Sequence, residues 1–431
     1  MKYSNYNYFL KKENNFVGIN FISELIFCLD NENYNKILNS KNDPQTIKKN
    51  DPHLFSLLKK LGVIIEENTD EKIIVKSKYN LTVFNDNSYR LTINPTLDCN
   101  LSCWYCYETH SKEQISTTTI ERIIKHVKYV IETKGIRNFN LDWFGGEPTL
   151  YFEEVIYPVS SIIQEICRAN NATFSNSITT NGYLIKQEWL KKIKEIKLFT
   201  FQITLDGAKE NHDKVKITRD HKGTFDKIVS NINLLCSSIE NVNLCLRINY
   251  QKNCHEGLED IINCFPESNR SKIKLLIQQI WQTEDEEGVI SFDNLYSVFE
   301  TKGIAKISNQ SFKGYRCYAD KFNQAVVNTD GAVFKCTAVD FLNEKPDGLL
   351  LENGQIKWDL KLLGERFGQA PIDSEMCTNC EFLPLCLGPC SQKMIRSGLK
   401  NLDQQYCLKL GVKEALDERL SKYYSEIKGK S

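Results

Sequence analysis

Residues 90–106 read RLTINPTLDCNLSCWYC, an apolar run that leads directly into three cysteines. The run Arg90–Pro95 has the composition of a β-strand, and the loop after it carries the spacing C-x3-C-x2-C. Three thiolates on one tight loop can hold three corners of an iron–sulfur cubane, which normally has four cysteine ligands. The remaining iron would then be open to a small chelating ligand. The alternative for such a loop is a zinc site completed by a ligand from elsewhere.

Downstream of this loop, strand-like and helix-like segments alternate. We expect strands at Arg90–Pro95, Phe139–Phe144, Thr173–Thr179, Phe199–Leu205, Asn243–Tyr250 and Lys274–Ile280. Helical periodicity falls at Thr117–Glu132, Glu153–Ala169, Lys186–Ile196, Thr224–Ser238, Glu256–Cys264 and Phe292–Thr301. Six such units in series predict an α/β fold in which a parallel sheet curls into a partial (β/α)6 barrel. In barrels of this kind the chemistry lies at the C-terminal ends of the strands.

The composition limits the classes of partner. The 431 residues carry 55 Lys and Arg against 55 Asp and Glu, so the formal net charge is zero. This balance gives no reason to expect nucleic acid or a membrane surface as a partner. The N-terminal residues lack the apolar core of a signal peptide, so we expect a cytoplasmic protein. In that reducing compartment the 16 cysteines are expected to be thiols or ligands rather than disulfides.

The length predicts two or three domains, and the sequence pattern changes near residues 88 and 302. Residues 1–88 form an expected α+β module, with a hairpin at Tyr6–Leu10 and Phe16–Phe21, helices at Asn31–Leu38 and Pro52–Leu61, and a further strand at Ile73–Val75. Residues 89–302 form the expected barrel. Residues 303–431 contain a hairpin turn at Asp330-Gly331, a dense set of cysteines and a charged helical tail at Lys409–Ile427.

A second motif, Phe144-Gly145-Gly146-Glu147-Pro148, ends the second expected strand. Glycines let the backbone approach a ligand closely, and a neighbouring carboxylate can accept hydrogen bonds from an ammonium group. The alternative is a plain strand-to-helix turn. The position of the motif, one unit after the cysteine loop, favours a role in ligand binding.

Together these motifs resemble those of the radical S-adenosylmethionine (SAM) enzyme superfamily. The resemblance rests on Cys99, Cys103 and Cys106, on Tyr105, and on the segment 145–148. It continues through the TTNG, TLDG and LRIN stretches at 179–182, 204–207 and 246–249. It implies that the three cysteines hold a [4Fe–4S] cluster whose open iron chelates the amino and carboxylate groups of SAM. It also implies that one-electron reduction yields a 5′-deoxyadenosyl radical.

The resemblance also implies which residues contact SAM. Tyr105 would pack on the adenine, and Gly145, Gly146 and Glu147 would meet the methionine ammonium group. The polar residues expected at strand ends facing the cofactor are Thr180, Asn181, Thr204, Asp206 and Arg247. The chain departs from its relatives after the fourth strand, where the common His-Asp-x-x-Arg reads HDKVK at 212–216, with Arg219 three residues later. Lysine is not a geometric equivalent of arginine, so this departure argues against a bidentate carboxylate clamp here.

Seven more cysteines gather in the last third of the chain: Cys317, Cys336, Cys377, Cys380, Cys386, Cys390 and Cys407. The array resembles the SPASM domain of radical SAM enzymes that act on peptides and proteins. The resemblance implies one auxiliary [4Fe–4S] cluster on Cys377, Cys380, Cys386 and Cys407, and another on Cys317, Cys336 and Cys390. Three [4Fe–4S] clusters are therefore expected, and the last has an open iron unless Cys254 or Cys264 joins it. Core packing is expected for most of Cys28, Cys167, Cys236, Cys245, Cys254 and Cys264.

The leading hypothesis is a radical SAM maturase of a ribosomally made precursor peptide. It would abstract a hydrogen from the peptide and install a thioether or a carbon–carbon crosslink. The module 1–88 is similar to leader-peptide recognition elements, which bind a leader as an added strand. A structural cap over the barrel is the alternative for that module. An electron donor such as ferredoxin or flavodoxin is the other expected partner, and the sequence names no catalytic acid or base.

The resemblance extends to anaerobic sulfatase maturases, which oxidise a Cys or Ser to formylglycine. Those enzymes place an aspartate general base directly after the cysteine of a Gly-x4-Cys element. Here Gly331-x4-Cys336 is followed by Thr337, which cannot act as that base, although Asp340 lies close in sequence. This hypothesis is therefore second. A non-catalytic iron–sulfur electron carrier is third, because a carrier needs no SAM pocket.

Overall fold

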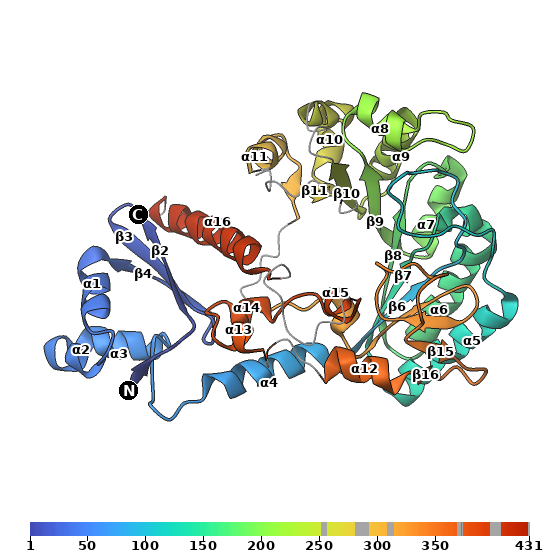
Figure 1. Ribbon diagram of the computed structural model, residues 1–431. Coiled ribbons are helices and arrows are strands. Elements are labelled where there is room, and N and C mark those ends of the chain that lie inside the picture. Colours follow the sequence, from blue (N-terminus) through green and yellow to red (C-terminus); the bar gives the residue numbers. More distant parts are fainter. Residues whose placement is uncertain are drawn as a thin grey trace. The chain divides into compact units, whose positions relative to one another are not determined.

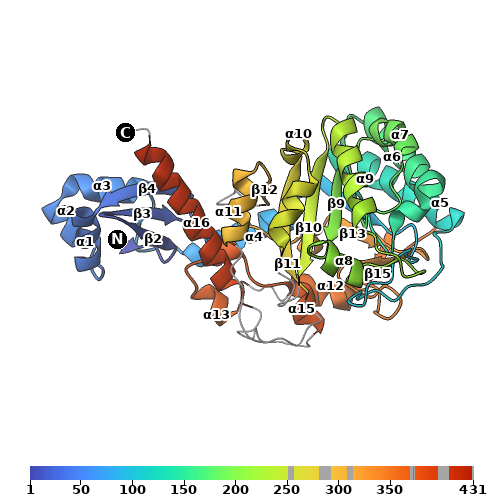
Figure 2. The same ribbon diagram turned by 90° about the horizontal axis from the view of Figure 1, so that it is seen from above.

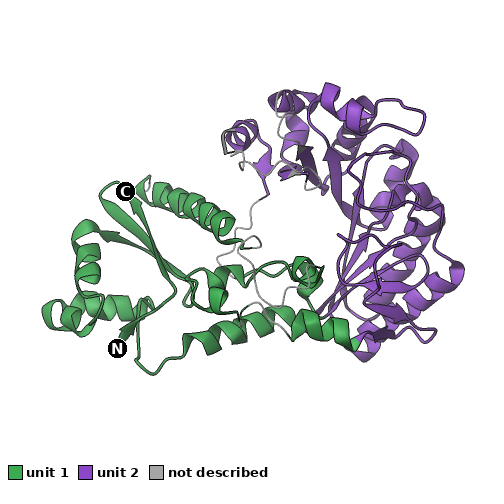
Figure 3. Cartoon of the chain, viewed as in Figure 1, with its two compact units in different colours: residues 1–85, 309–322, 360–431 green, residues 86–308, 323–359 purple. Residues whose placement is uncertain are grey.

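The computed structural model describes residues 1–250, 257–280, 293–307, 314–368, 372, 374–396 and 407–429. The chain divides into two compact units (Figure 3). Unit 1 joins residues 1–85, 309–322 and 360–431, whereas unit 2 joins residues 86–308 and 323–359. Cys254, one of the six cysteines outside the two motifs, lies outside the described residues.

A curved, mostly parallel sheet forms the centre of unit 2 (Figure 1). Its six main strands are β6 (Ser88–Ile93), β7 (Asn138–Trp143), β8 (Thr173–Thr180), β9 (Leu198–Leu205), β10 (Asn243–Tyr250) and β11 (Ile273–Gln279). Each strand pairs in parallel with the next one along the chain. A short strand, β12 (Ala305–Lys306), extends the sheet beyond β11. The partial (β/α)6 barrel predicted from the sequence is confirmed, and the strands lie within a residue or two of their predicted positions.

Helices connect the parallel strands and pack on one side of the curved sheet, as α5, α6 and α7 show in Figures 1 and 2. The helical segments are α5 (Thr117–Lys128), η1 (Tyr129–Thr133), η2 (Pro148–Tyr151), η3 (Phe152–Ile156), α6 (Tyr157–Ala169), η4 (Gln187–Trp189), α7 (Leu190–Glu195), α8 (Lys209–Val215), α9 (Phe225–Ser238), η5 (Leu258–Cys264), α10 (Glu267–Arg270) and α11 (Asp293–Thr301). In α5, the Ser116 hydroxyl caps the first turn by accepting from the Thr119 N–H. Ile123 and Val127, one turn apart, then face the core.

The hairpin predicted around Asp330-Gly331 is confirmed, and it belongs to the same sheet. β13 (Gln324–Val327) and β14 (Ala332–Phe334) pair antiparallel, and Gly331 has the positive φ of +88° that the turn requires. β13 also pairs in parallel with β6, and β15 (Gly348–Leu350) and β16 (Ile356–Trp358) continue beyond β14. The C-terminal end of β13 therefore lies beside that of β6, from which the cysteine loop emerges.

Unit 2 has one continuous apolar core between its sheet and its helices. Leu91, Leu141, Ile203, Leu246 and Leu275, one from each of five parallel strands, are fully buried. Two of the six cysteines expected in cores, Cys167 and Cys236, are buried in this cluster. By contrast, Cys28 of unit 1 is exposed. The core fixes the positions of the strand ends, and the strand ends carry the polar residues discussed below.

The N-terminal part of unit 1 is a small sheet with helices. The predicted hairpin is confirmed as β2 (Asn7–Lys12) and β3 (Asn15–Asn20), and the third strand β4 (Leu25–Asp30) was missed. The remaining elements are β1 (Lys2–Tyr3), α1 (Asn31–Asn39), α2 (Gln45–Asn50), α3 (Pro52–Lys60), β5 (Ile64–Ile65) and α4 (Glu71–Val83). The short strands β1 and β5 pair with each other. Both helices predicted from the sequence here, at 31–38 and 52–61, are confirmed.

The strand predicted at Ile73–Val75 is wrong, because these residues lie within helix α4. The Asp70 carboxylate accepts hydrogen bonds from two backbone N–H groups of the first turn and so starts the helix. Val75, Tyr79 and Val83 then recur every four residues along the buried face. The helical cap and this periodicity therefore override the strand preference of three β-branched residues in a row.

The C-terminal part of unit 1 consists of short helices and one long one. They are η6 (Tyr318–Asp320), α12 (Leu360–Phe367), α13 (Glu375–Thr378), α14 (Leu383–Cys386), α15 (Ser391–Arg396) and α16 (Lys409–Lys428). The predicted tail helix is confirmed as α16, whose Leu416 and Leu420 pack in a core with Val17, Ile19 and Phe21. None of the helices described in either unit is long and apolar enough to cross a membrane.

Candidate active site

An open cavity of about 190 Å³ lies at the C-terminal ends of the parallel strands of unit 2. It is lined by all three cysteines of the first motif, Cys99, Cys103 and Cys106. Seven of the nine predicted SAM contacts also line it: Tyr105, Gly145, Gly146, Thr180, Asn181, Thr204 and Arg247. The other two, Glu147 and Asp206, are buried behind the lining residues. The structure thus brings together residues that lie up to 148 positions apart, from Cys99 to Arg247.

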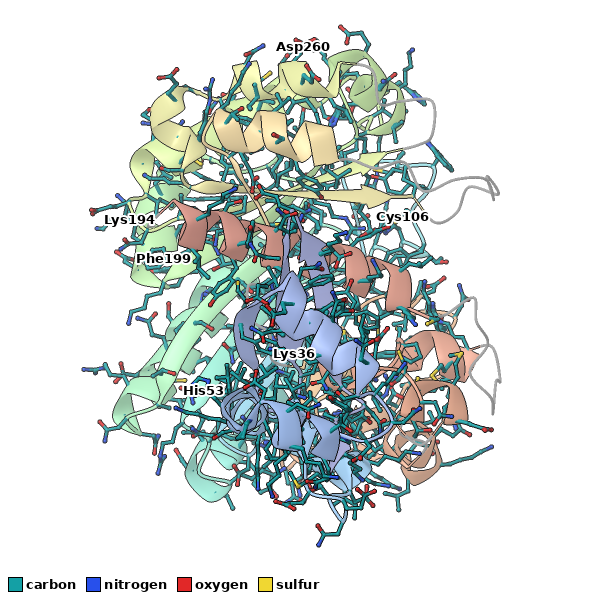
Figure 4. All side chains as sticks on the ribbon, turned by 90° about the vertical axis from the view of Figure 1, so that its left-hand side faces the viewer. Lys36, His53, Cys106, Lys194, Phe199 and Asp260 are labelled. Carbon is teal, nitrogen blue, oxygen red and sulfur yellow. The ribbon has the colours of Figure 1, made fainter. Side chains whose placement is uncertain are left out.

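The cysteine loop is held by its own backbone and by a neighbouring loop. The Cys106 N–H donates to the Cys103 carbonyl at 3.1 Å, and the Ser102 N–H donates to the Ile217 carbonyl at 2.9 Å. Cys99 is buried and Cys106, labelled in Figure 4, is exposed. Burial raises the pKa of Cys99, and it raises that of Cys103 to about 12. Iron binding must therefore displace the thiol protons, as metal binding to cysteine generally does.

The glycines at 145 and 146 allow a close backbone approach beneath this loop. Gly145 has a φ of +104°, and a Cβ on it would lie 2.4 Å from the Thr96 carbonyl oxygen. A Cβ on Gly146 would lie 2.2 Å from the Asp98 carbonyl oxygen. The N–H groups of Gly146 and Glu147 donate to these same two carbonyls, at 3.2 and 2.7 Å. Only glycine fits here, and the Gly-Gly turn fixes the segment that leads into Cys99.

Glu147 is fully buried, and neighbouring residues donate hydrogen bonds to both of its carboxylate oxygens. Oε1 accepts from the Thr149 N–H at 2.9 Å, from the Thr149 hydroxyl, and from the Thr180 hydroxyl at 2.7 Å. Oε2 accepts from the Asn181 N–H at 2.7 Å. Burial raises the pKa of Glu147, against the effect of these hydrogen bonds. In this geometry Glu147 ties the end of β7 to the end of β8, and its expected contact with an ammonium group stays a prediction.

Tyr105 and Asp206 form the centre of a buried polar network. Asn249 adds its side-chain amide, which donates to the Tyr105 hydroxyl at 3.1 Å. Lys216 lies 3.7 Å from Asp206 and donates to the Thr204 carbonyl at 3.2 Å. Its side chain is only 6% exposed, yet it lines the cavity. Asn249 and Lys216 therefore join the site, although the sequence assigned neither of them a contact.

The His-Asp pair of the HDKVK stretch has a structural role. His212 Nδ1 accepts from the Asp206 N–H at 3.1 Å, and Nε2 lies 3.0 Å from the Thr224 hydroxyl, which donates to the Lys216 carbonyl. Asp213 accepts from the backbone N–H groups at the start of α9. The imidazole thus holds the backbones of Asp206 and Lys216 at a fixed spacing. Arg219 does not take the place of the missing arginine, because it pairs with Asp98.

The residues after Cys106 contact the segment that follows Cys336. Tyr107 donates its hydroxyl to the Thr337 carbonyl at 3.2 Å, and Thr109 donates its hydroxyl to Asp340 at 2.7 Å. Burial alone would raise the pKa of Asp340, but hydrogen bonds from Thr109, Asn343 and backbone amides outweigh it and lower that pKa.

Glu108 lines the cavity, and its pKa is raised rather than lowered. Burial first, and the charge of Asp340 next, raise the pKa of Glu108 to about 8. Sequence reasoning missed Glu108, for which no motif gave a signal.

These features fit a cubane cluster with a small polar ligand. Three free thiols share the wall of one cavity, and the buried Glu108 Oε2 on that wall has no hydrogen-bond partner among the described residues. Within those residues, no three Cys, His, Asp or Glu side chains are close enough to hold a single metal ion. A cubane cluster does not need three ligands around one metal ion, because each cysteine binds a different iron atom.

The C-terminal cysteines divide between the two units. Four of these cysteines, Cys377, Cys380, Cys386 and Cys407, all lie in unit 1. Burial first, and then the charges of the other three thiols, raise the pKa of Cys377 to about 12, so the four sulfurs lie close together. Cys317 and Cys390 also lie in unit 1, and burial first, with Asp320 and then Cys390 adding to it, raises the pKa of Cys317. Cys336 follows β14 in unit 2. The four-cysteine group is therefore compact, and the grouping of Cys336 with Cys317 and Cys390 stays a prediction.

Known proteins are similar to this chain in sequence and in fold. Residues 93–262 match the radical SAM superfamily. The cysteine-type anaerobic sulfatase-maturating enzyme of Clostridium novyi is 25% identical over 351 residues, which cover 70% of this chain and 88% of that protein. Native anSMEcpe with bound AdoMet matches 78% of this chain and 99% of its own, with a TM-score of 0.58 and 20% identity. Streptococcus suis SuiB bound to precursor peptide SuiA matches 93% and 97%, with a TM-score of 0.52 and 18% identity.

The described residues of unit 2 thus form an open α/β barrel with a cysteine-lined cavity at its strand ends. The family match places a radical SAM domain at residues 93–262, which include the three cysteines of this cavity. A radical SAM domain implies one [4Fe–4S] cluster and SAM, and Cys99, Cys103 and Cys106 are the candidate cluster ligands.

Proposed function

We propose that the chain is a radical SAM peptide maturase that installs a thioether or a carbon–carbon crosslink in a ribosomally made precursor peptide. When bound, the reduced cluster and SAM supply a 5′-deoxyadenosyl radical. Cys99, Cys103 and Cys106 hold the cluster, and the backbone at Gly145 and Gly146 orients the methionine end of SAM. Tyr105, fixed by Asp206 and Asn249, provides the surface for the adenine.

The proposed bond formation balances in atoms and electrons. The radical takes a hydrogen atom from a peptide C–H bond, which leaves 5′-deoxyadenosine and a carbon-centred peptide radical. Attack of that radical on a cysteine S–H or a second C–H forms the crosslink and releases one proton and one electron. Two auxiliary [4Fe–4S] clusters on the C-terminal cysteines would accept the electron. A ferredoxin or flavodoxin would supply the electron that cleaves SAM.

The observation that supports a peptide substrate is an edge strand of the three-stranded sheet in unit 1. The sheet has the order β2-β3-β4, so β2 and β4 are edges among the described strands. β2 ends in Lys11 and Lys12, and edge lysines discourage further pairing. β4 carries no lysine or proline, and its Leu25 is 44% exposed. We assign β4 as the strand that binds a leader peptide by β-augmentation. The match to SuiB supports this, since it covers 93% of this chain.

The test uses anaerobic enzyme, dithionite, SAM and synthetic peptides from the short reading frames that flank the coding sequence. We expect one peptide to lose two hydrogens for each 5′-deoxyadenosine formed. Leu25→Lys should raise the KM for that peptide at least tenfold and leave kcat unchanged. Ile73→Lys, at a residue that is 63% exposed on α4, is the matched control. An unchanged KM in Leu25→Lys would favour the structural cap instead.

A second candidate is the anaerobic sulfatase maturase, which the Clostridium novyi relative favours. It would oxidise a sulfatase Cys or Ser to formylglycine and needs a base to take the hydroxyl or thiol proton. Thr337 cannot be that base. Asp340 is engaged by Thr109 and Asn343, and its lowered pKa makes it a weaker base. A sulfatase-derived peptide with its target cysteine, assayed beside the flanking peptides, distinguishes the two functions by mass change.

A further inference from the structure

Arg316 is a fully buried arginine of unit 1, the unit that contains six of the seven C-terminal cysteines. Its side chain is 3% exposed and immediately precedes Cys317. One terminal nitrogen donates to three consecutive carbonyl oxygens, those of Leu387, Gly388 and Pro389, at 3.2, 2.9 and 2.7 Å. The other donates to the Ser391 hydroxyl at 2.7 Å. These acceptors lie in the loop between Cys386 and Cys390 and directly after it.

The loop that Arg316 binds has an unusual backbone. Leu387 and Gly388 both have positive φ, +53° and +94°. A non-glycine residue in this region is uncommon and costs free energy, which surrounding contacts must offset. The turn directs three carbonyls toward one place, where the guanidinium satisfies all of them. Arg316 therefore determines the conformation in which Cys386 and Cys390 are presented.

Arg316 also belongs to a buried charge cluster. Its second terminal nitrogen lies 2.6 Å from Asp320 Oδ2, and Arg366 lies 3.5 Å from Oδ1 of the same carboxylate. Two guanidinium groups against one carboxylate leave one positive charge among three side chains that are at most 4% exposed. A buried charge is costly unless it is paired.

We propose that Arg316 is a positioning residue for the auxiliary iron–sulfur centres, holding the Cys386–Cys390 loop and supplying the positive charge that balances an anionic cluster. This inference rests on the proposed auxiliary clusters. A cubane held by thiolates is anionic, and reduction adds a further negative charge. A fixed cation nearby stabilises the reduced form and raises the reduction potential, which net charge and hydrogen bonding are known to tune.

The test is made in a full-length variant that lacks the first cluster, Cys99→Ala with Cys103→Ala and Cys106→Ala. All remaining iron then belongs to the C-terminal cysteines. After anaerobic reconstitution with iron and sulfide, iron content and an electron paramagnetic resonance redox titration are measured. If this background binds no iron, the proposed auxiliary clusters are absent. If it binds about eight irons per chain, the clusters exist and Arg316 can be tested separately.

In that background Arg316→Gln should lower the reduced-to-oxidised ratio at a fixed potential at least tenfold, which is about 59 mV for a one-electron couple. Arg316→Lys keeps the positive charge but loses the planar guanidinium that binds the loop carbonyls. This variant should therefore retain most of the reduction potential but bind less iron. Arg366→Gln removes the other guanidinium that faces Asp320 but leaves the loop contacts of Arg316 in place, so it should keep the iron content of the background. Full iron content with an unshifted potential in both Arg316 variants would overturn the inference. If Arg316→Gln does not fold, wild-type iron content in Arg316→Lys would overturn it alone.

Discussion

The hydroxyl of Tyr105 donates to the carboxylate of Asp206, whose two oxygens both lie 2.8 Å from it. This contact joins the cysteine loop to the C-terminal end of β9, across 101 positions of sequence. Asp206 is almost fully buried, and burial raises its pKa against the effect of Lys216 and Tyr105. The position of Tyr105 in the cavity therefore depends on a carboxylate that does not itself line the cavity.

Tyr105→Phe should destabilise the protein and weaken SAM binding. It removes one donor from a buried carboxylate, which typically costs about 1–3 kcal/mol in the free energy of unfolding. Urea unfolding and the KM for SAM measure the two effects. The control is Tyr157→Phe, which removes a comparable hydroxyl donated to Glu195 on the surface and should leave the KM unchanged. Equal KM values for the Tyr105 variant and wild type would show that this contact does not position the SAM site.

Glu147→Gln should lower the free energy of unfolding by about 1–3 kcal/mol. In the wild type both carboxylate oxygens accept hydrogen bonds, and the amide NH2 of Gln would place a donor against one of those N–H or hydroxyl groups. Urea unfolding measures the change. Glu153→Gln, in a half-exposed pair with Lys192, should have no measurable effect. Wild-type stability of Glu147→Gln would mean that this carboxylate is not the anchor between β7 and β8.

Gly146→Ala should abolish binding of the first cluster. Its Cβ would meet the Asp98 carbonyl at 2.2 Å and push away the segment that carries Cys99. Iron analysis after reconstitution should show a loss of about four irons per chain. Gly364→Ala is the control, because a Cβ there meets nothing within 4 Å. Retention of full iron content in Gly146→Ala would contradict the close packing of the Gly-Gly turn.

Acid should destabilise unit 2 through its buried histidines. Burial lowers the pKa of His126 to about 4 and that of His212 to about 3, below the usual value near 6.5. The unfolded chain therefore binds these protons first, so stability is complete above about pH 6.5 and is lost as the pH falls toward 4 and then 3. Each histidine should cost about 1.4 kcal/mol per pH unit in that window.

Urea unfolding at pH 7.5, 6 and 5 measures this dependence. His126 donates from Nδ1 to the Gly354 carbonyl and accepts at Nε2 from the Tyr89 hydroxyl, and the second of these bonds requires the neutral ring. His126→Gln cannot titrate and should reduce the slope by about half. A slope that is the same in His126→Gln and wild type would show that this histidine is not the titrating group.

The sequence predicted the barrel because each strand carries its own signal. The runs that became β6–β11 are apolar, β-rich and separated by amphipathic helices, so local pattern and tertiary structure agree. The pairing of β13 with β6 could not be predicted, because two short strands 231 or more positions apart choose each other only through packing of the whole sheet. Ile73–Val75 shows the opposite case, in which a local strand preference was overridden by a helix cap and a buried helical face.

The sequence predicted the site residues whose type is required by their chemistry. It did not predict those whose position depends on the packing of distant segments. The three cysteines and the Gly-Gly turn are fixed by spacing and by the absence of a side chain. The burial of Glu147 depends on partners at Thr180 and Asn181 on the next strand, which no local pattern reveals. Lys216 is similar: its place in the sequence suggested only a lost arginine, whereas the fold puts its ammonium group at the cavity wall beside Asp206.

The most direct test of the central claim is 5′-deoxyadenosine formation by anaerobically reconstituted protein with dithionite and SAM. Wild type should form 5′-deoxyadenosine, and Cys99→Ala should form none while it keeps the iron bound by the C-terminal cysteines. Equal formation in Cys99→Ala, or none in wild type that carries a full complement of iron, would contradict the assignment of this cavity as the SAM-cleaving site.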